Sequence, residues 1–440
     1  PFDPDRARAL LDEAGWLVGD DGKRYKDGEQ LVLDWWNMTD FPVYDEMAPF
    51  LQAQYATLLG VKVNLNSQSW PGIGDTLTSG IHHVGITSLK QPDGLSVMSI
   101  ILSCAGDARK GGFNWSFYCN EEVDAAVAAT RQLPDGPEKY AATEAIVVQI
   151  MEESPYIPMI EPQVVVVHPS DLGGIAFNGT DGTVLYHAVQ STDVAAAAAP
   201  ASTYREVLVY VVPSLRGEDL GCPDCSLGST LNMNPMFEPL LYREVKSGVI
   251  VEGEGRMAET WSVNDDFTEY SFKLREGMQF HGGWGELTTT DVVWSHELMT
   301  RPETTSPRAA LFGKMEIVVD GPYEFRLVAK DGDGDGNLDP APDVLSQLAE
   351  QALSFMVTSK DYWDTVGEEA ARLHPIGSGP YQFKEHVPGV SLTFEKFDGH
   401  YRTVPEIDEF VIQVIPESNT RFDLLTVGDA DLMVGSFDQL

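Results

Sequence analysis

An aspartate-rich stretch in the second half of the chain has the spacing of a calcium-binding loop. Asp331, Asp333 and Asp335 alternate with glycines, and Gly336 follows directly. In such loops, oxygens at positions one, three and five surround a hard cation, and a glycine at position six makes the sharp turn. The remaining candidate ligands are the backbone carbonyl of Asn337 and the carboxylates of Asp339 and Asp343.

The twelfth position of this loop departs from the usual pattern. It is Pro342, where calcium loops of this type usually have a bidentate glutamate. Asp339 or Asp343 would have to take over that role. Two interpretations remain open: a structural calcium site that fixes a loop, and an acidic, glycine-rich surface loop of an acidic protein.

The four cysteines form two local pairs, Cys104 with Cys119 and Cys222 with Cys225. A disulfide in the first pair would close a loop rich in Gly, Ser and Asn and add about 3 kcal/mol of stability on the chain-entropy model. The second pair is a CxxC motif among Gly, Pro and Asp, which favours a loop disulfide over a redox site. Disulfides would indicate an oxidising compartment. Free thiols and a four-cysteine zinc site are the alternatives.

Trp35 and Trp36 end a predicted strand at residues 31–36. In open α/β sheets, ligands bind beyond the carboxyl ends of the strands, where an aromatic ring can stack on them. Neighbouring residues of a strand alternate between its faces, so one of the two is expected to face the core. Both are candidates for lining a ligand pocket.

Other residue types that carry chemistry form no convincing catalytic group in the sequence. His82, His83, His281, His374 and His400 have no partner at i+4 and are interpreted as structural or exposed. The sequence contains no G-x-S-x-G elbow, no P-loop and no GxGxxG motif. No catalytic group can therefore be assigned from these residues.

Composition narrows the class of protein further. The 440 residues carry a formal net charge of −39, spread over both halves, and 43% of them are hydrophobic. Such a charge repels nucleic acid and anionic membrane surfaces, while the apolar fraction excludes bulk disorder. No apolar run reaches the 18 or more residues of a membrane-spanning helix. No signal peptide is visible at Pro1, which leaves the location of the protein undecided.

Residues 194–203, rich in Ala and containing Pro200, predict a linker between a first part, residues 1–193, and a second part, residues 204–440. Strand, helix and strand over residues 31–65 predict a βαβ unit with a parallel sheet. The second part is richer in strands, so the expected fold class is α/β and α+β. The predicted helices are 6–14, 44–59, 121–130, 137–153, 292–299 and 343–352; the predicted strands are 31–36, 61–65, 84–86, 164–167, 206–212, 270–274, 324–328 and 391–396.

Several stretches together resemble the extracytoplasmic solute-binding proteins of ABC importers, in the peptide/nickel-binding family, also called family 5. In the second part, residues 257–281 resemble the family's "sw.vsdD…ytF.LR.gv.Fh", and Pro375–Tyr381 resembles "P.GTGPY". Residues 290–295 and 234–242 match further family segments. In the first part, residues 3–16 resemble "yDPekAkaLLaEAGw".

The two parts stand in the reverse of the family's order. The segment that resembles 204–440 comes first in the family, and a segment that normally joins the two is present in neither part. We interpret the chain as a fragment of a tandem fusion: the C-terminal part of one binding protein, the linker, and the N-terminal part of the next. A circular permutant is the alternative.

The resemblance implies a periplasmic-binding-protein-like architecture of two lobes that close on a buried ligand, here represented by two incomplete parts. Residues 1–193 would form the second lobe and return to the first lobe after about residue 160, and residues 204–440 would form the first lobe. Cys104 and Cys119 fall where dipeptide-binding members carry a disulfide. Those members bind the peptide ammonium with the Asp of a Gly-Trp-x-x-Asp stretch. Here Gly85–Leu89 lacks the Trp, and Asp93 lies four residues beyond.

The resemblance implies a non-catalytic protein of the periplasm or another extracytoplasmic space. It would capture peptides or a similar small solute by lobe closure and deliver the solute to the membrane permease of an importer. Neither nucleic acid nor direct membrane insertion is expected. Two alternatives remain: a secreted hydrolase that uses the same cleft, and a calcium-stabilised extracytoplasmic module without a transport role.

Overall fold

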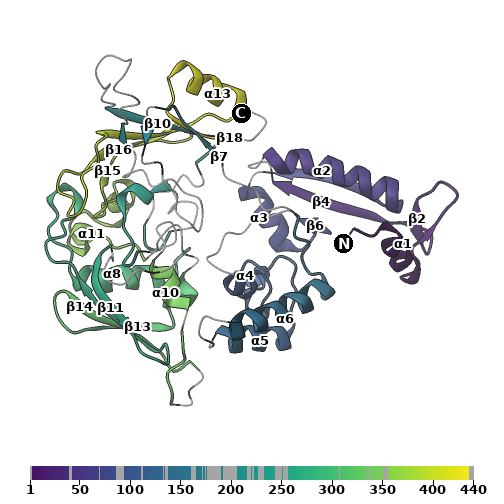
Figure 1. Ribbon diagram of the computed structural model, residues 1–440, viewed down its shortest axis with the longest axis horizontal. Coiled ribbons are helices and arrows are strands. Elements are labelled where there is room, and N and C mark those ends of the chain that lie inside the picture. The colour runs from purple at the N-terminus through teal and green to yellow at the C-terminus, as the bar shows by residue number, and fades with distance from the viewer. Residues whose placement is uncertain are drawn as a thin grey trace. The chain divides into compact units, whose positions relative to one another are not determined.

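The contacts in a computed structural model divide the chain into two compact units, Pro1–Met159 and Ile160–Leu440 (Figure 1). Among the residues that the structure describes, no helix has both the length and the apolar character needed to cross a bilayer. The described residues are 2–38, 42–68, 70–85, 94–110, 112–131, 133, 137–159, 165–170, 172–173, 175, 190–191, 206–215, 220, 222–225, 232–242, 250, 256–306, 308–332, 334, 336–341, 343–349 and 355–435.

A parallel sheet of order β5-β4-β6 organises the first unit. Helix α2 lies beside β4 in Figure 1 and leads through the wide turn η1 to β5, which confirms the predicted βαβ unit. Gly60 ends η1 in the left-handed conformation, as expected of a glycine at a helix end. The elements are β4 (Val32–Met38), α2 (Pro42–Gln54), η1 (Tyr55–Leu59), β5 (Lys62–Gln68), α3 (Trp70–Ser79) and β6 (Val84–Gly85).

Two smaller groups of elements complete the first unit. Helix α1 begins where the side chain of Asp3 accepts the Arg6 N–H, and an antiparallel sheet of order β1-β2-β3 follows. Helices α4, α5 and α6 share a separate hydrophobic cluster. The elements are α1 (Pro4–Glu13), β1 (Leu17–Val18), β2 (Arg24–Lys26), β3 (Glu29–Gln30), α4 (Gly94–Ile101), α5 (Glu121–Arg131) and α6 (Pro137–Glu153).

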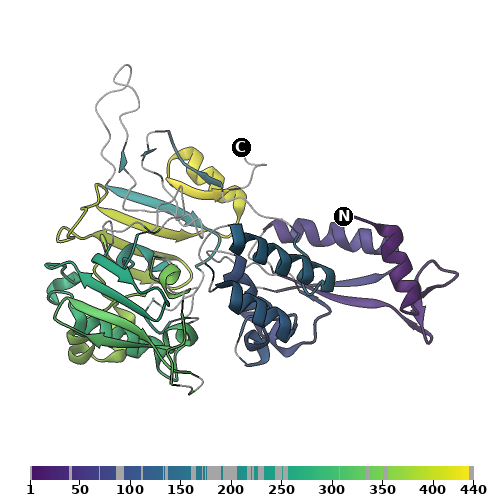
Figure 2. The same cartoon turned by 60° about the horizontal axis from the view of Figure 1, so that its bottom comes forward.

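A six-stranded mixed sheet of order β15-β16-β17-β10-β18-β7 forms one layer of the second unit. Strand β10 is parallel to β17 and β18, and the other pairs are antiparallel. Helix α13, the yellow helix in Figure 2, packs on β18 through a small apolar cluster around Met433. The elements are β7 (Val165–Val167), β10 (Val207–Val212), β15 (Tyr381–Val387), β16 (Ser391–Lys396), β17 (Glu409–Val414), α13 (Ser418–Val427) and β18 (Leu432–Gly435).

An antiparallel sheet of order β11-β12-β14-β13 forms the other part of the second unit and contributes to its largest hydrophobic core. Helix α8 begins with a capping box between Thr288 and Asp291, which satisfies free N–H groups at the helix start. The elements are β11 (Ala258–Val263), β12 (Glu269–Leu274), α8 (Thr289–Thr300), α9 (Ala309–Phe312), β13 (Met315–Val319), β14 (Glu324–Ala329), α10 (Asp343–Leu348), α11 (Lys360–Val366) and α12 (Glu368–Leu373).

The contacts divide the chain near residue 160, after which the resemblance implies that residues 1–193 return to the first lobe, and not at the predicted linker. The contacts divide the chain between Met159 and Ile160, whereas the sequence predicts a linker at 194–203. The reason is strand β7, which pairs antiparallel with β18, so a strand from residues 1–193 and one from residues 204–440 share a sheet. Residues 194–203 lie outside the described residues, and their role as a linker stays a prediction.

Candidate functional site

The carboxyl edge of the β5-β4-β6 sheet is the candidate ligand surface of the first unit. Trp35 is buried at this edge, since only 3% of the residue is exposed. Its ring contacts the ring of Tyr55 edge-on, with 6.1 Å between the two centroids. The expectation that one tryptophan faces the core is thereby confirmed. The alternation of β4 turns Trp35 inward, and its role as a ligand residue stays a prediction.

Trp36 remains a candidate because its side chain is only half-buried at the margin of the same core. Its indole Nε1 is shielded from solvent, and no acceptor among the described residues lies within hydrogen-bond distance. The indole Nε1 of Trp35 has the same surroundings, so this feature does not distinguish the two tryptophans as ligand residues. Asp93 lies outside the described residues, so its role stays a prediction.

The first predicted disulfide is present between Cys104 and Cys119, whose Cα atoms are 4.4 Å apart. The closed loop surrounds Asn114, which is fully buried. The Asn114 side-chain amide donates to the carbonyl oxygens of Ser103 at 2.9 Å and of Tyr118 at 2.6 Å. The disulfide and this amide therefore hold the irregular segment between α4 and α5.

Replacing both Cys104 and Cys119 by serine is expected to lower the stability of the first unit by about 3 kcal/mol, because the unfolded chain regains loop entropy. Urea unfolding, followed by circular dichroism without reductant, measures this change. An Asn114→Ala variant that keeps the disulfide separates the contribution of the amide. Unchanged stability after removal of the disulfide would show that the other contacts alone hold the loop.

The aspartate-rich loop connects β14 to α10, and its ends are held by carboxylates. Asp331 accepts the Gly334 N–H at 2.6 Å and the Gly336 N–H at 2.8 Å. Asp339 accepts the Gly332 N–H at 3.1 Å. The structure describes Asn337, but Asp333, Asp335 and the side chain of Asp343 lie outside the described residues. Calcium binding by this loop stays a prediction.

His281 connects two segments that resemble the family, residues 257–281 and Pro375–Tyr381, by hydrogen bonds. Its Nδ1 accepts the Gly377 N–H at 3.2 Å, and its Nε2 donates to the Gly379 carbonyl oxygen at 2.9 Å. These contacts place the proton on Nε2. Burial lowers the pKa of His281 to about 4, so the ring is neutral at pH 7. Its environment is that of a structural histidine, as the sequence predicts.

Glu238 is the centre of a buried charged cluster in the second unit and is 3% exposed. It accepts from Tyr401 Oη and from Arg402 Nη2, each at 2.5 Å, and His400 Nε2 lies 3.4 Å away. Burial alone would raise the pKa of Glu238. His400 and the charges of Arg402 and Arg256 outweigh burial and hold this pKa well below its usual range.

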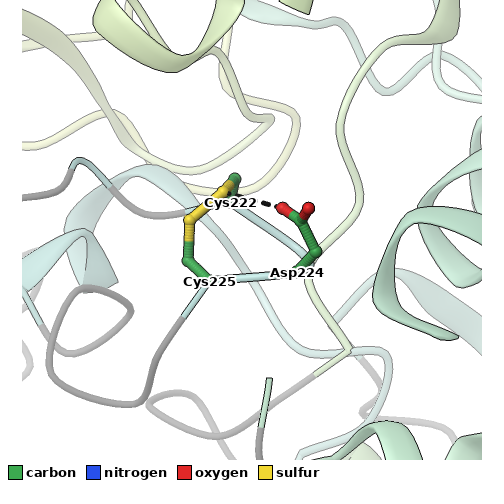
Figure 3. A group of neighbouring side chains, drawn as sticks. All are labelled: Cys222, Asp224 and Cys225. Atoms are coloured by element: carbon green, nitrogen blue, oxygen red, sulfur yellow. Dashed lines mark hydrogen bonds between the residues drawn. A yellow bond between two sulfur atoms is a disulfide. The ribbon is translucent and has the colours of Figure 1, made fainter. Parts of the chain in front are cut away.

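The CxxC motif forms the second disulfide, between Cys222 and Cys225, in a turn where the Cys225 N–H donates to the Cys222 carbonyl at 3.0 Å (Figure 3). All four cysteines are therefore paired, which confirms the disulfide interpretation over free thiols. Asp224 lies buried between the two cysteines and pairs with Arg301 at 2.5 Å and Arg372 at 2.7 Å. These ion pairs attach the turn to the end of α8 and to α12.

Two of these arrangements were not expected from the sequence: the Glu238 cluster and the Asp224 ion pairs. Their members are far apart in the chain, since 163 residues separate Glu238 from Tyr401 and 148 separate Asp224 from Arg372. No local sequence motif indicates which residues would pair in either arrangement. The one available signal was the position of Glu238 within the recognised segment 234–242.

Comparison with known proteins gives matches to solute-binding proteins. The dipeptide-binding protein of Escherichia coli strain K12 is 26% identical over 214 residues, which cover 45% of this chain and 39% of that protein. The oligopeptide-binding protein AppA of Bacillus subtilis strain 168 is 30% identical over 208 residues, covering 46% and 37%. The chain therefore spans less than half the length of either curated relative.

Among solved structures, AppA of Bacillus subtilis in complex with a nonapeptide has a TM-score of 0.42 and 24% identity, and the match covers 51% of this chain and 43% of that one. The family model described as "Bacterial extracellular solute-binding proteins, family 5 Middle" matches residues 1–108 and 252–439, which together make up more than half of the chain. The chain belongs to family 5 of the bacterial extracellular solute-binding proteins.

Proposed function

We propose that the chain acts in the substrate-binding component of an ABC importer, and that it captures peptides or a similar small solute for a membrane permease. The family match over residues 1–108 and 252–439 carries this proposal. Relatives named as dipeptide-, oligopeptide- and glutathione-binding proteins support a peptide-like solute. Binding would favour a closed form that the permease recognises. The role is binding and not catalysis.

The same proposal places the protein in the periplasm or another extracytoplasmic space. The family description names extracellular proteins. Two disulfides support this location, because disulfides persist in oxidising compartments.

A binding titration with a Trp36 variant tests the proposal. We expect isothermal titration calorimetry with a set of short peptides to give saturable binding, and Trp36→Ala to weaken it about tenfold, since an aromatic contact contributes about 0.5–1.5 kcal/mol beyond the area it buries. Trp16→Ala, a substitution elsewhere in the first unit, is the matched control. Equal affinities for both variants would remove Trp36 from the site, and absence of any binding would contradict the proposed function.

We propose further that the aspartate-rich loop binds calcium and stabilises the second unit without taking part in solute capture. The D-x-D-x-D-G spacing supports this. Calcium at a hundred times its Kd is expected to add about 2.7 kcal/mol to the free energy of unfolding. Asp331→Asn should abolish that increase, whereas Asp320→Asn, at a carboxylate paired with Arg326, should retain it. Scanning calorimetry with calcium and with a chelator measures the effect, and a chelator-independent melting temperature would contradict it.

We propose further that the chain joins pieces of two binding proteins in tandem, because the motifs of its two parts resemble family segments in the reverse of the family's order. The genomic sequence on both sides of the region that encodes residues 1–440 tests it. We expect the missing family segments there, in frame. A start codon directly before Pro1 together with a stop codon directly after Leu440 would contradict the tandem arrangement.

A further inference from the structure

The Cys222–Cys225 turn brings together three side chains that could bind a metal ion. One donor atom each from Cys222, Asp224 and Cys225 lies within 4.8 Å of the other two, and all three residues are buried. No other such group occurs among the described residues. In Figure 3 the Asp224 carboxylate points toward the Cys222 sulfur. In the oxidised protein the sulfurs are bonded to each other and offer no thiolate.

The two oxygens of the Asp224 carboxylate have different surroundings. Oδ2 accepts hydrogen bonds from Arg301 and Arg372, whereas Oδ1 lies 3.0 Å from Cys222 Sγ. A disulfide sulfur has no proton to donate, so this last approach is a contact and not a hydrogen bond. A carboxylate that binds a metal through one oxygen is commonly oriented by hydrogen bonds at the other. Asp224 is already held in that way, with Oδ1 facing the sulfurs.

Arg372 also contacts the two sulfurs directly. Its Nη1 lies 2.9 Å from Cys222 Sγ and 3.7 Å from Cys225 Sγ. A guanidinium at this distance can donate a hydrogen bond to a metal-bound sulfur. Arg372 is therefore already placed to donate to both sulfurs of a metal site.

The charges of the cluster also favour a divalent cation after reduction. In the oxidised form, Asp224 and Glu368 balance Arg301 and Arg372, which pair with both carboxylates. Two thiolates would add two negative charges in a buried site, which is costly unless they are compensated. One divalent ion restores neutrality.

We propose that reduction of the Cys222–Cys225 disulfide creates a zinc-type metal site with Cys222 Sγ, Cys225 Sγ and Asp224 Oδ1 as ligands. A dithiol supplies the two electrons and two protons: the S–S bond breaks, both sulfurs become thiols, and the dithiol is oxidised to its disulfide. Metal binding then releases the two thiol protons to solvent. Two sulfurs and one oxygen suit a borderline-soft ion such as Zn²⁺, and the oxidised turn would bind none.

Cobalt(II) is a suitable probe because thiolate coordination gives it visible and near-ultraviolet absorption. The full chain is reduced with dithiothreitol, freed of reductant without oxygen, and titrated with Co²⁺; zinc displaces the probe. We expect one thiolate-bound Co²⁺ per reduced chain beyond that of a Cys222→Ser, Cys225→Ser variant, and no such binding by the oxidised chain. Equal cobalt spectra for the reduced wild type and the double variant would overturn the proposal.

Asp224→Asn tests the oxygen ligand and is expected to weaken Co²⁺ binding at least about tenfold. Asp320→Asn makes the same change at an arginine-paired carboxylate without neighbouring sulfurs, and should leave the affinity unchanged. Near-ultraviolet circular dichroism of the reduced chain shows whether the second unit stays folded. Binding that is independent of Asp224, or that occurs only in an unfolded chain, would overturn the assignment.

Discussion

Replacing Glu238 by alanine is expected to lower the free energy of unfolding of the second unit by about 4 kcal/mol. The substitution removes the buried carboxylate that pairs with Arg402, and breaking a buried ion pair by removing one partner typically costs about 3–5 kcal/mol. Tyr401 also loses its 2.5 Å hydrogen bond to the carboxylate. Chemical denaturation followed by tryptophan fluorescence measures the change.

Glu259→Ala is the matched control, because Glu259 forms an exposed pair with Lys273 and its loss should cost less than about 1 kcal/mol.

The contribution of Glu238 to the free energy of unfolding is expected to decrease as the pH falls. The folded state lowers the pKa of Glu238, so the stabilisation is present at neutral pH and is lost as pH falls below about 4.3, the unfolded value. A gap between wild type and Glu238→Gln that stays constant down to pH 3 would contradict this account.

Gly379→Ala is expected to destabilise the second unit by about 3 kcal/mol, because overpacking a tight backbone contact costs energy on that scale. A Cβ at Gly379 would lie 2.5 Å from the carbonyl carbon of Met236 and 2.8 Å from the amide nitrogen of Phe237. Backbone atoms cannot rotate away as a side chain can. The Gly379 N–H also donates to the Met236 carbonyl at 2.8 Å, so any shift weakens that bond as well.

Gly321→Ala separates this steric effect from the general effect of replacing glycine. A Cβ at Gly321 meets its nearest neighbour, an atom of Glu324, only at 3.9 Å. We expect this variant to differ from wild type by less than about 1 kcal/mol. Thermal unfolding of both variants provides the comparison. Similar melting temperatures for the two would show that the Gly379 junction relaxes without strain.

Local structure could be predicted from the sequence where a pattern repeats within a few residues. The alternation in β12, β14 and β16 predicted these strands within about one residue of their observed bounds, and Gly60 correctly indicated the end of a helical segment. The two cysteine pairs were also predictable, because each is close in sequence.

Long-range pairing was not predictable, because local periodicity carries no information about which strand lies beside which. Strand β10 pairs with β17 and β18, some two hundred residues later, and β7 joins the same sheet. The residues of the candidate site could be predicted only in part for the same reason. Alternation showed that one tryptophan of the pair faces inward, but only the packing against Tyr55 identified it as Trp35.

Native mass spectrometry of the full chain incubated with a pool of short peptides tests the central claim most directly. The account predicts one bound peptide per folded chain, released on denaturation and absent when the chain is unfolded beforehand. Circular dichroism of the same sample verifies folding, and an unrelated acidic protein of similar size controls for non-specific adducts. A folded chain that retains no peptide from the pool, with calcium or without it, would contradict the assignment of solute capture to these 440 residues.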